Sequence, residues 1–466
     1  MEENQYSFQQ LNPKKASKSI RKLLRQKWLV VVFALILTGL GAALTGVLFK
    51  SGIHEMEVYR KELLANFPVW IVLPTLGSAG GLISGIIINK GSPAAGGSGV
   101  THIMAFLRHR KVPMGLRVGI VKLIAGIIAI GSGFPLGPEG PAVQMGGSVA
   151  WKMAQWLKAP IAFRRVIVAA GGGAGIAAIF SAPIGGFIYA IEELLNSARP
   201  VVLLLVVVTT FSADSWANII QGNGFQDIPK YPQLESFKFI PIDIGYLIIL
   251  GVVIGVLAEL YCKYVLAMQR KGNHWFKNKS VLRLTISGLV LGIFYSFLPE
   301  TFHHVGDLKD LLVTGNANST LALGTFLILF FSTGLAAASG APGGLFFPML
   351  ILGGCIGSAL GTFLEILTGH IPSSYIFAGM GAFVAACSRT PITAMFLAFA
   401  MTKELIILKP LLITCITSFL IARIFSQHSI YERQIDMELN EKNLFNKTSS
   451  TKLEETSLIH HSLIKH

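Results

Sequence analysis

The feature that most limits how this chain can fold is a charge-free apolar run from Trp28 to Phe49. At about 1.5 Å per residue, a helix of that length spans the roughly 30 Å hydrocarbon core of a bilayer. Only 14% of the residues are charged, against roughly 25% in soluble domains. We therefore expect an all-α polytopic membrane protein, and neither a soluble enzyme nor a disordered chain. We count about eleven such stretches, near residues 28–49, 70–89, 115–131, 166–191, 201–222, 243–262, 284–298, 319–338, 343–369, 374–401 and 405–422.

The basic residues indicate how these stretches are oriented. The net charge is +15, and most of the excess lies beside apolar runs, in residues 1–30, 91–138 and 261–299. Cytoplasmic loops of membrane proteins have this pattern, whereas a nucleic-acid-binding protein gathers its basic residues on one face. We therefore expect both termini in the cytoplasm and no nucleic-acid partner. The basic segment Lys14–Lys27 fits an interfacial helix and a solvated arm equally well.

The two halves of the chain resemble each other at a nearly constant offset. Ser132-Gly133 matches Ser339-Gly340, and Gly146-Gly147 matches Gly353-Gly354, each 207 residues later. Duplicated halves interrupted by Gly and Pro are typical of transporters with a site between the repeats. The repeats are inverted if each half crosses the membrane an odd number of times. We expect a basic cytoplasmic arm (1–27), a first membrane repeat (28–222), an extracytoplasmic linker (223–242), a second membrane repeat (243–431) and a short polar cytoplasmic tail (432–466).

The four cysteines lie scattered inside apolar segments, with no CxxC or His/Cys spacing. We interpret them as small buried hydrophobic residues. The sequence predicts no disulfide framework, no metal site and no cofactor. The cysteines are Cys262, Cys355, Cys387 and Cys415.

Glycine-rich breaks interrupt the apolar stretches at 96–100, 137–141 and 343–348, and a fourth break follows the last stretch at 429–431. Each of the first three can start a helix, and a helix N-terminus offers unpaired N–H groups and about half a positive charge. Several N-termini aimed at one point therefore predict an anion site without a Lys or Arg. Close helix packing is the alternative reading, and it suits Gly77, Gly81 and Gly85. The glycines assigned to the site backbone are Gly97, Gly99, Gly137, Gly140, Gly343 and Gly344.

Glu139 lies at a Pro-flanked helix start inside the membrane. A carboxylate there costs a few kcal/mol unless it is compensated. Glu139 could occupy the anion site when ionised and leave it when protonated, which would couple proton and anion occupancy. A capping role is the alternative.

Glu192 and Glu193 end an apolar helix that starts near Ala182. Adjacent helical positions differ by about 100°, so the two cannot face one partner. We expect one in the protein interior and the other facing water or a basic loop. Other ionisable residues lie within apolar runs, and we interpret them as structural pairs or snorkelling groups; these are Lys122, Asp214, Glu259 and Glu365.

The motifs GPEGP followed by AVQMGG, GGLFFP, and SAPIGGFIYAIEE resemble the CLC family of chloride channels and chloride/proton antiporters. The resemblance runs from about residue 28 to 440 and implies an inverted repeat of many tilted, partly re-entrant helices. It implies a homodimer with one pathway per subunit, a lipid bilayer, and chloride and protons as the transported ions. By resemblance, Glu139 is the external gating glutamate and Glu193 the internal proton-transfer glutamate of antiporters. The chloride-site residues implied are Ser98, Tyr431 and Phe346, with the backbone amides of Leu345 and Phe346.

The sequence also departs from the family pattern. Pro138 stands where the family commonly has Arg, which removes a positive charge near Glu139. Val100-Thr101-His102 replaces a common Ile-Pro-Glu. Ser98 favours chloride over nitrate, and Ser98 together with Tyr431 argues against the fluoride-selective branch. A tail too short for the cytoplasmic CBS domains of many members suggests a prokaryotic-type member in a bacterial inner membrane.

Three other functions compete with a chloride/proton exchanger. The nearest is a passive, voltage- or pH-gated chloride channel of the same family, from which Glu193 distinguishes an antiporter. Gly96-Gly97-Ser98-Gly99 also fits the GxSG pattern of rhomboid proteases, with His102 one helical turn after Ser98, but no second-helix histidine is evident as a base. A membrane scaffold without transport leaves the breaks and Glu139 unexplained.

Overall fold

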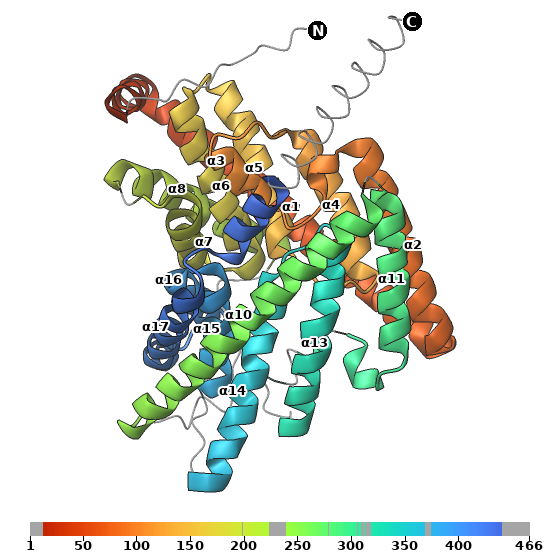
Figure 1. Ribbon diagram of the computed structural model, residues 1–466. Coiled ribbons are helices and arrows are strands. Elements are labelled where there is room, and N and C mark those ends of the chain that lie inside the picture. Colours follow the sequence, from red (N-terminus) through yellow and green to blue (C-terminus); the bar gives the residue numbers. More distant parts are fainter. Residues whose placement is uncertain are drawn as a thin grey trace, which may run out of the picture.

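The computed structural model is a bundle of helices (Figure 1). It describes residues 13–197, 199–222, 239–277, 279–304, 306–308, 312, 318–368 and 374–439. Within these residues, eight helices are long and apolar enough to cross a membrane. The expected all-helical multi-span fold is therefore confirmed.

The first half of the chain forms helices up to Gln221. Its last part contains a short π-helical turn, η2 (Ala190–Leu195), directly after α7. The helices are α1 (Pro13–Asn66), α2 (Val69–Gly91), α3 (Val100–Leu107), α4 (Leu116–Gly131), α5 (Glu139–Trp156), α6 (Ile161–Phe180), α7 (Pro183–Tyr189) and α8 (Pro200–Gln221).

The second half follows the same order. Residues 223–238 of the predicted linker lie outside the described residues. The helices are α10 (Ile242–Phe276), α11 (Ser280–Ser296), α13 (Ser319–Ser339), α14 (Phe346–Thr368), α15 (Tyr375–Ser388), α16 (Pro391–Thr402) and α17 (Leu408–Phe425), followed by a helix at 430–439.

Two of the predicted apolar stretches are each broken in two. Residues 166–191 contain the end of α6 and all of α7, separated by Ser181 in the left-handed conformation (φ 49°). Residues 374–401 contain α15 and α16, separated by Arg389 in the same conformation (φ 63°). A proline follows each break by two residues, and it starts the next helix because its fixed φ suits the first turn. The sequence predicted the helix start near Ala182 but did not separate α15 from α16, because the break at Arg389 is short compared with the apolar helices on either side.

The predicted helix start at Glu139 is confirmed as the start of α5, although α5 is absent from the predicted apolar stretches. Its apolar residues are interrupted by Gln144, Ser148 and Lys152. Gln144 and Ser148 are fully buried, so protein rather than lipid surrounds this face of the helix. A helix covered by protein can carry polar residues that a lipid-facing helix cannot.

Equivalent glycines of the two halves meet at the centre of the molecule. Gly137 and Gly344, 207 residues apart, exchange backbone hydrogen bonds of 2.8 and 2.7 Å in an antiparallel bridge. An antiparallel pairing of equivalent residues relates the two halves by a local two-fold axis. At this point the two halves therefore pair through residues that the predicted repeat makes equivalent, and they run in opposite directions.

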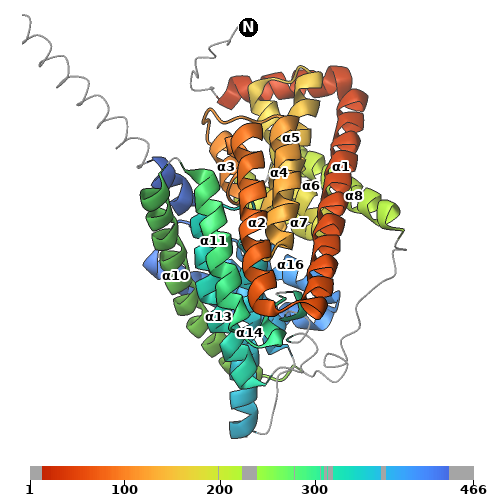
Figure 2. The same ribbon diagram turned by 90° about the vertical axis from the view of Figure 1, so that its right-hand side faces the viewer.

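Small residues allow the closest helix crossings. A Cβ on Gly77 would lie 2.3 Å from the Gly288 carbonyl oxygen, and one on Gly81 would lie 2.3 Å from the Leu284 carbonyl oxygen. A Cβ on Gly85 would lie 2.9 Å from the Cα of Val281, which is still closer than side chains normally approach. The packing role predicted for these glycines is confirmed: they bring α2 against α11 (Figure 2).

Both ends of the predicted membrane body are helical; for the N-terminal arm this agrees with the interfacial-helix alternative. The arm at 13–27 is the first part of α1, and it lies across the end of the bundle instead of continuing the line of the spanning part (Figure 2). The tail predicted from Glu432 begins inside the helix at 430–439, where Gln434 and Ile435 are each only 3% exposed. Packed residues thus continue to 439.

Candidate functional site

Three helices start at one place near the middle of the bundle. Gly99 is the N-cap of α3, with φ of 88°, while α5 begins at Glu139 and α14 at Phe346. A Cβ on Gly140 would lie 2.1 Å from the Ser98 carbonyl oxygen and 3.0 Å from the Gly344 Cα. The structure therefore brings the first three predicted breaks together. The positive ends of three helix dipoles meet there, as an anion site requires.

The Glu139 carboxylate lies between these helix starts. Its Oε1 accepts hydrogen bonds from the backbone N–H groups of Phe346, at 2.5 Å, and Phe347, at 3.1 Å. Its Oε2 is buried without a hydrogen-bond partner. The sequence predicted compensation by N–H groups, and the structure places the donors on α14 of the other half. The side chain reaches them across Gly344, which has no Cβ in the way.

The other predicted anion-site residues line the same region. The Ser98 hydroxyl is buried without a hydrogen-bond partner and lies 2.9 Å from where a Cβ on Gly140 would be. The Phe346 ring packs on Phe180, with 5.8 Å between centroids. Tyr431 is 2% exposed and lies within electrostatic reach of Glu139. Leu345, 2% exposed, directly precedes the two amides that bind Glu139.

Each of the six predicted site positions requires glycine, but for different structural reasons. A Cβ on Gly344 would lie 2.3 Å from Glu139 Oε1, and one on Gly137 would lie 2.1 Å from Glu139 Oε2. A Cβ on Gly343 would lie 2.5 Å from the Leu136 Cβ. The backbone conformation, with positive φ, accounts for Gly97 and Gly99. Gly140 is fixed by its contact with Ser98.

A buried lysine holds the backbone that precedes Ser98. Lys122 is fully buried on α4, and its Nζ donates to the carbonyl oxygens of Ala95 at 2.9 Å and Gly97 at 2.5 Å. Gln144 of α5 donates to the Ala94 carbonyl at 2.8 Å. These carbonyls would otherwise repel an anion. The predicted structural pairing of Lys122 is confirmed, but the sequence did not indicate that its partner is the site backbone.

Glu193 lies at a second place, toward the helix at 430–439. It is 6% exposed, and the Ser429 hydroxyl donates to its Oε1 at 3.5 Å. Ser429 and Glu432 form a capping pair at the start of that helix, and Arg108 forms a salt bridge with Glu432. Ser429, which contacts Glu193, and Tyr431 both belong to the fourth predicted break, at 429–431. This break therefore brings Glu193 close to Tyr431 through its contacts along the chain.

Glu192 is half-buried, and its carboxylate contacts the start of α16. Its carboxylate accepts hydrogen bonds from the N–H groups of Ile392, at 3.3 Å, and Thr393, at 2.7 Å, and from the Thr393 hydroxyl at 2.7 Å. It thus caps α16, whose own N-cap residue makes no side-chain cap bond. A carboxylate at a helix N-terminus is compensated by the dipole. The expectation of different partners for the two glutamates is confirmed.

Tyr189 is a candidate that the sequence reasoning missed. It is 3% exposed, and its hydroxyl is buried without a hydrogen-bond partner. It lies within electrostatic reach of both Glu193 and Glu139. The available signal was its spacing, since Tyr189 and Glu193 are four residues apart on one helical segment.

The remaining intramembrane ionisable residues lie away from this site. Glu259 is 3% exposed and accepts from Arg433 at 2.8 and 3.1 Å and from Arg389 at 3.0 Å, so its predicted structural pairing is confirmed. Asp214 accepts a 3.4 Å hydrogen bond from Asn218, and Glu365 is exposed.

The protease reading finds no support in the geometry. His102 bonds through Nε2 to the Pro113 carbonyl at 2.6 Å, and the Ser98 hydroxyl has no hydrogen-bond partner. A serine nucleophile requires a base within hydrogen-bond reach. Among the described residues, no group of three His, Cys, Asp or Glu side chains could hold a metal ion.

Comparisons with known proteins agree with this geometry. The family model described as voltage gated chloride channel matches residues 80–423. The H(+)/Cl(-) exchange transporter ClcA of Vibrio cholerae is 28% identical over 432 residues, covering 89% of this chain and 91% of that protein.

Solved structures show the same fold. A slow cyanobacterial Cl-/H+ antiporter has a TM-score of 0.80 at 26% identity and covers 89% of this chain and 99% of its own. A CLC-type fluoride/proton antiporter has a TM-score of 0.72 at 20% identity and covers 86% and 96%.

Proposed function

Because this chain belongs to the voltage-gated chloride channel family, whose members here include transporters and not enzymes, we propose that it exchanges chloride for protons across a membrane. The observation that carries the proposal is the position of Glu139. Its carboxylate accepts the amides at the start of α14, the same donors that an anion would use. A carboxylate and a chloride ion therefore compete for one set of N–H groups.

The proton steps follow from that competition. Ionised Glu139 is stabilised by the α14 amides, whereas protonated Glu139 loses most of that attraction and leaves them to chloride. Glu193 supplies the second carboxyl group, near the Ser429–Glu432 cap. Tyr189, within electrostatic reach of both glutamates, provides a hydroxyl along the path between them. The protons thus reach Glu139 from the side of the helix at 430–439.

The anion steps use the remaining donors. Ser98 and Tyr431 contribute hydroxyl groups, and Leu345 and Phe346 contribute backbone amides. No Lys or Arg side chain bonds Glu139 among the described residues, and Lys122 is turned toward carbonyls. Backbone amides and hydroxyl groups carry no full charge, so they bind an anion weakly enough to release it.

Chloride is the halide that this site favours over fluoride. The fold is shared with a fluoride/proton antiporter, but the family resemblance associates the hydroxyl pair of Ser98 and Tyr431 with chloride. A passive chloride channel of the same family is the competing function, and the position of Glu193 beside Ser429 favours the exchanger.

We also propose the cellular setting from the family resemblance. The protein forms a homodimer with one pathway per subunit, in a bacterial inner membrane, with both termini in the cytoplasm. Each pathway is built from the two membrane repeats, 28–222 and 243–431. Crosslinking of the purified protein into dimers tests the assembly.

Proton movement in liposomes tests the function. With an outward-to-inward chloride gradient and no proton gradient, the reconstituted protein is expected to drive protons in the opposite direction to chloride. A proton ionophore added afterwards should collapse the resulting pH difference. Chloride flux without any uphill proton flux would assign the passive channel instead.

A further inference from the structure

Glu193 is a buried carboxyl group whose recorded partner is a hydroxyl and not a cation. It is 6% exposed, and none of the salt bridges among the described residues includes it. It accepts a hydrogen bond from the Ser429 hydroxyl at 3.5 Å. The proton occupancy of such a group depends on the charges that lie beyond its hydrogen-bond partner.

The Glu432 carboxylate lies on the other side of Ser429. Its Oε2 accepts from the Ser429 N–H at 3.0 Å, and the Ser429 hydroxyl accepts from the Glu432 N–H at 3.2 Å. A Ser followed by a Glu three residues later forms this capping box at the start of a helix. Ser429 therefore contacts both carboxyl groups, and Glu432 lies within electrostatic reach of Glu193.

Arg108 binds the second oxygen of Glu432. Its Nη2 forms a salt bridge with Oε1, and the two side chains are 39% and 22% exposed. Water and salt screen the charges of such a half-buried pair less than those of a surface pair. A capping box works with either Glu or Gln, so capping explains neither the charge of Glu432 nor its salt bridge with Arg108.

We propose that the Arg108–Glu432 pair sets the pH range over which Glu193 takes up and releases protons. This inference rests on the proposed exchange function, in which Glu193 carries a proton. The negative charge of Glu432 repels ionised Glu193 and so favours its protonated form, whereas the Arg108 guanidinium favours the ionised form. Both are positioning residues, because they act on Glu193 and touch neither chloride nor Glu139.

The other ionisable groups around Glu193 are fixed or uncharged. Glu192 lies within electrostatic reach, but two amides and a hydroxyl hold its carboxylate at the start of α16. Tyr189 and Tyr431 are also within reach, and phenols ordinarily carry no charge near neutral pH. His428, 3.3 Å from the outer carboxylate, is 65% exposed and adds a charge only when it is protonated.

The same salt bridge also joins the two elements that carry the hydroxyl groups of the anion site. Arg108 is the C-cap residue of α3, which begins two residues after Ser98, and Glu432 directly follows Tyr431. Removing either partner breaks the same connection. A purely mechanical role therefore predicts the same change in both single variants, whereas an electrostatic role predicts opposite changes.

Uphill proton flux in liposomes, recorded as a function of pH, tests the proposal. Glu432→Gln keeps the capping geometry and loses the negative charge, so the pH midpoint of proton flux should fall by roughly 0.5–1 pH unit. Arg108→Gln should raise the midpoint by a smaller amount, and the double variant should lie close to the unmodified chain. Shifts in the same direction, or no shift in Glu432→Gln, would overturn the proposal.

A Glu193→Gln background shows whether the shift acts through Glu193. That variant has no carboxyl group to titrate at position 193, so adding Glu432→Gln should leave the pH profile of chloride flux unchanged. A shift that persists in this background would overturn the proposal. If Glu432→Gln does not fold, Arg108→Gln decides, and a lowered or unchanged midpoint in that variant would overturn the proposal as well.

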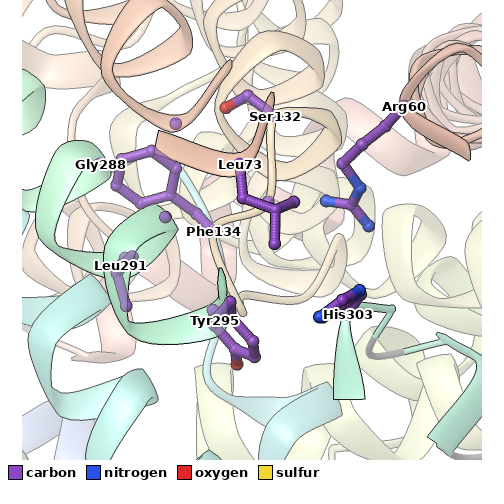
Figure 3. Close-up of a pocket in the computed structure, with 11 residues that line it drawn as sticks. Arg60, Leu73, Ser132, Phe134, Gly288, Leu291, Tyr295 and His303 are labelled. Atoms are coloured by element: carbon purple, nitrogen blue, oxygen red, sulfur yellow. The ribbon is translucent and has the colours of Figure 1, made fainter. Parts of the chain in front are cut away.

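The Lys61–Asp307 pair supplies a matched control. Both side chains are 50% exposed, and Asp307 lies within electrostatic reach of Arg60. Arg60 lines the small pocket of Figure 3, which includes neither partner of the proposed pair. Asp307→Asn should therefore leave the midpoint in place, and a shift as large as that of Glu432→Gln would overturn the proposal.

The unmodified chain separates failure of this proposal from failure of the proposed function. Absence of uphill proton flux in the unmodified chain would count against the exchange function itself. Proton coupling in the unmodified chain, with a midpoint that neither Glu432→Gln nor Arg108→Gln moves, would leave the exchange function standing and overturn only the role of the pair.

Discussion

The start of α5 and the start of α14 occupy equivalent places in the two repeats but carry different chemistry. Glu139 and Phe346 are 207 residues apart, the same offset that relates Gly137 to Gly344. The side chain of the first accepts a hydrogen bond from the backbone N–H of the second. The two halves thus present two helix N-termini at equivalent places, and only the first carries a carboxylate there.

In a second pair of equivalent segments, the carboxylates again lie in the first half and not in the second. α7 and α16 each follow a left-handed residue and begin at a proline 208 residues apart. The first is extended by η2, which carries Glu192 and Glu193, whereas the equivalent positions in the second are Ala400 and Met401. The two carboxylates of the proposed pathway, Glu139 and Glu193, are in the first half, and the second half supplies backbone donors to Glu139 and Glu192.

The largest effect on stability is expected in the second half, where the buried charges are structural. Glu259→Ala leaves Arg389 and Arg433 without their shared carboxylate. Removing one partner of a buried ion cluster costs about 3–5 kcal/mol. Equilibrium unfolding in mixed micelles measures this loss, and Glu365→Ala on exposed α14 surface is the matched control. Equal stability of the two variants would mean that the cluster is not structural.

Filling the space between the two helix starts comes next. Gly344→Ala places a Cβ 2.3 Å from Glu139 Oε1, which must displace the carboxylate or the backbone. Overpacking of this kind costs about 1–3 kcal/mol, so we expect chloride/proton exchange to fall roughly ten- to a hundredfold. Gly361→Ala, whose Cβ would have ordinary contact at 3.7 Å, should exchange normally. Normal exchange by Gly344→Ala would contradict the close contact between Gly344 and the Glu139 carboxylate.

Lys122→Met tests the backbone support of the first half. The change removes the donor to the Ala95, Gly96 and Gly97 carbonyls, and unsatisfied buried carbonyls cost about 1–3 kcal/mol in total. We expect lower stability and weaker chloride binding, read by calorimetric titration. Lys152→Met, on the exposed side of α5, serves as the control. Unchanged chloride affinity would show that the lysine holds only the fold.

The adjacent glutamates should separate into a cap and a proton carrier. Glu192→Gln loses the charge at the start of α16, an effect of about 1 kcal/mol on stability, and keeps proton coupling. Glu193→Gln should keep stability and lose coupling in the liposome assay. If Glu192→Gln lost coupling and Glu193→Gln lost stability, Glu193 would be the cap and Glu192 the proton carrier.

The sequence predicted most of the fold because glycine and charge carry strong signals in a membrane protein. The apolar runs, the repeat and the helix starts at Val100, Glu139 and Phe346 follow from composition and from the breaks. The helix start near Ala182 was predicted, whereas the break at Arg389 was not, because it is short compared with the apolar helices that flank it. Hydropathy did not mark the rest of α5 as an apolar stretch, because its buried polar residues are surrounded by protein and not by lipid.

The sequence predicted which residues form the candidate site better than it predicted which residues they contact. The sequence placed Glu139 at a helix start but did not indicate that its carboxylate accepts hydrogen bonds from backbone amides of the other half. That contact joins residues about 207 positions apart. For the same reason it did not foresee that Glu192 caps α16 or that Lys122 holds the loop before Ser98. Contacts between distant segments depend on packing, which no local pattern encodes.

The measurement that tests the central claim most directly compares Glu139→Gln with the unmodified chain in liposomes, recording chloride and proton flux in the same preparation. Glutamine has the size of glutamate but does not ionise, so it cannot compete with chloride as a carboxylate. The account predicts that Glu139→Gln keeps chloride flux and loses uphill proton flux completely. Proton coupling that survives in Glu139→Gln would contradict it.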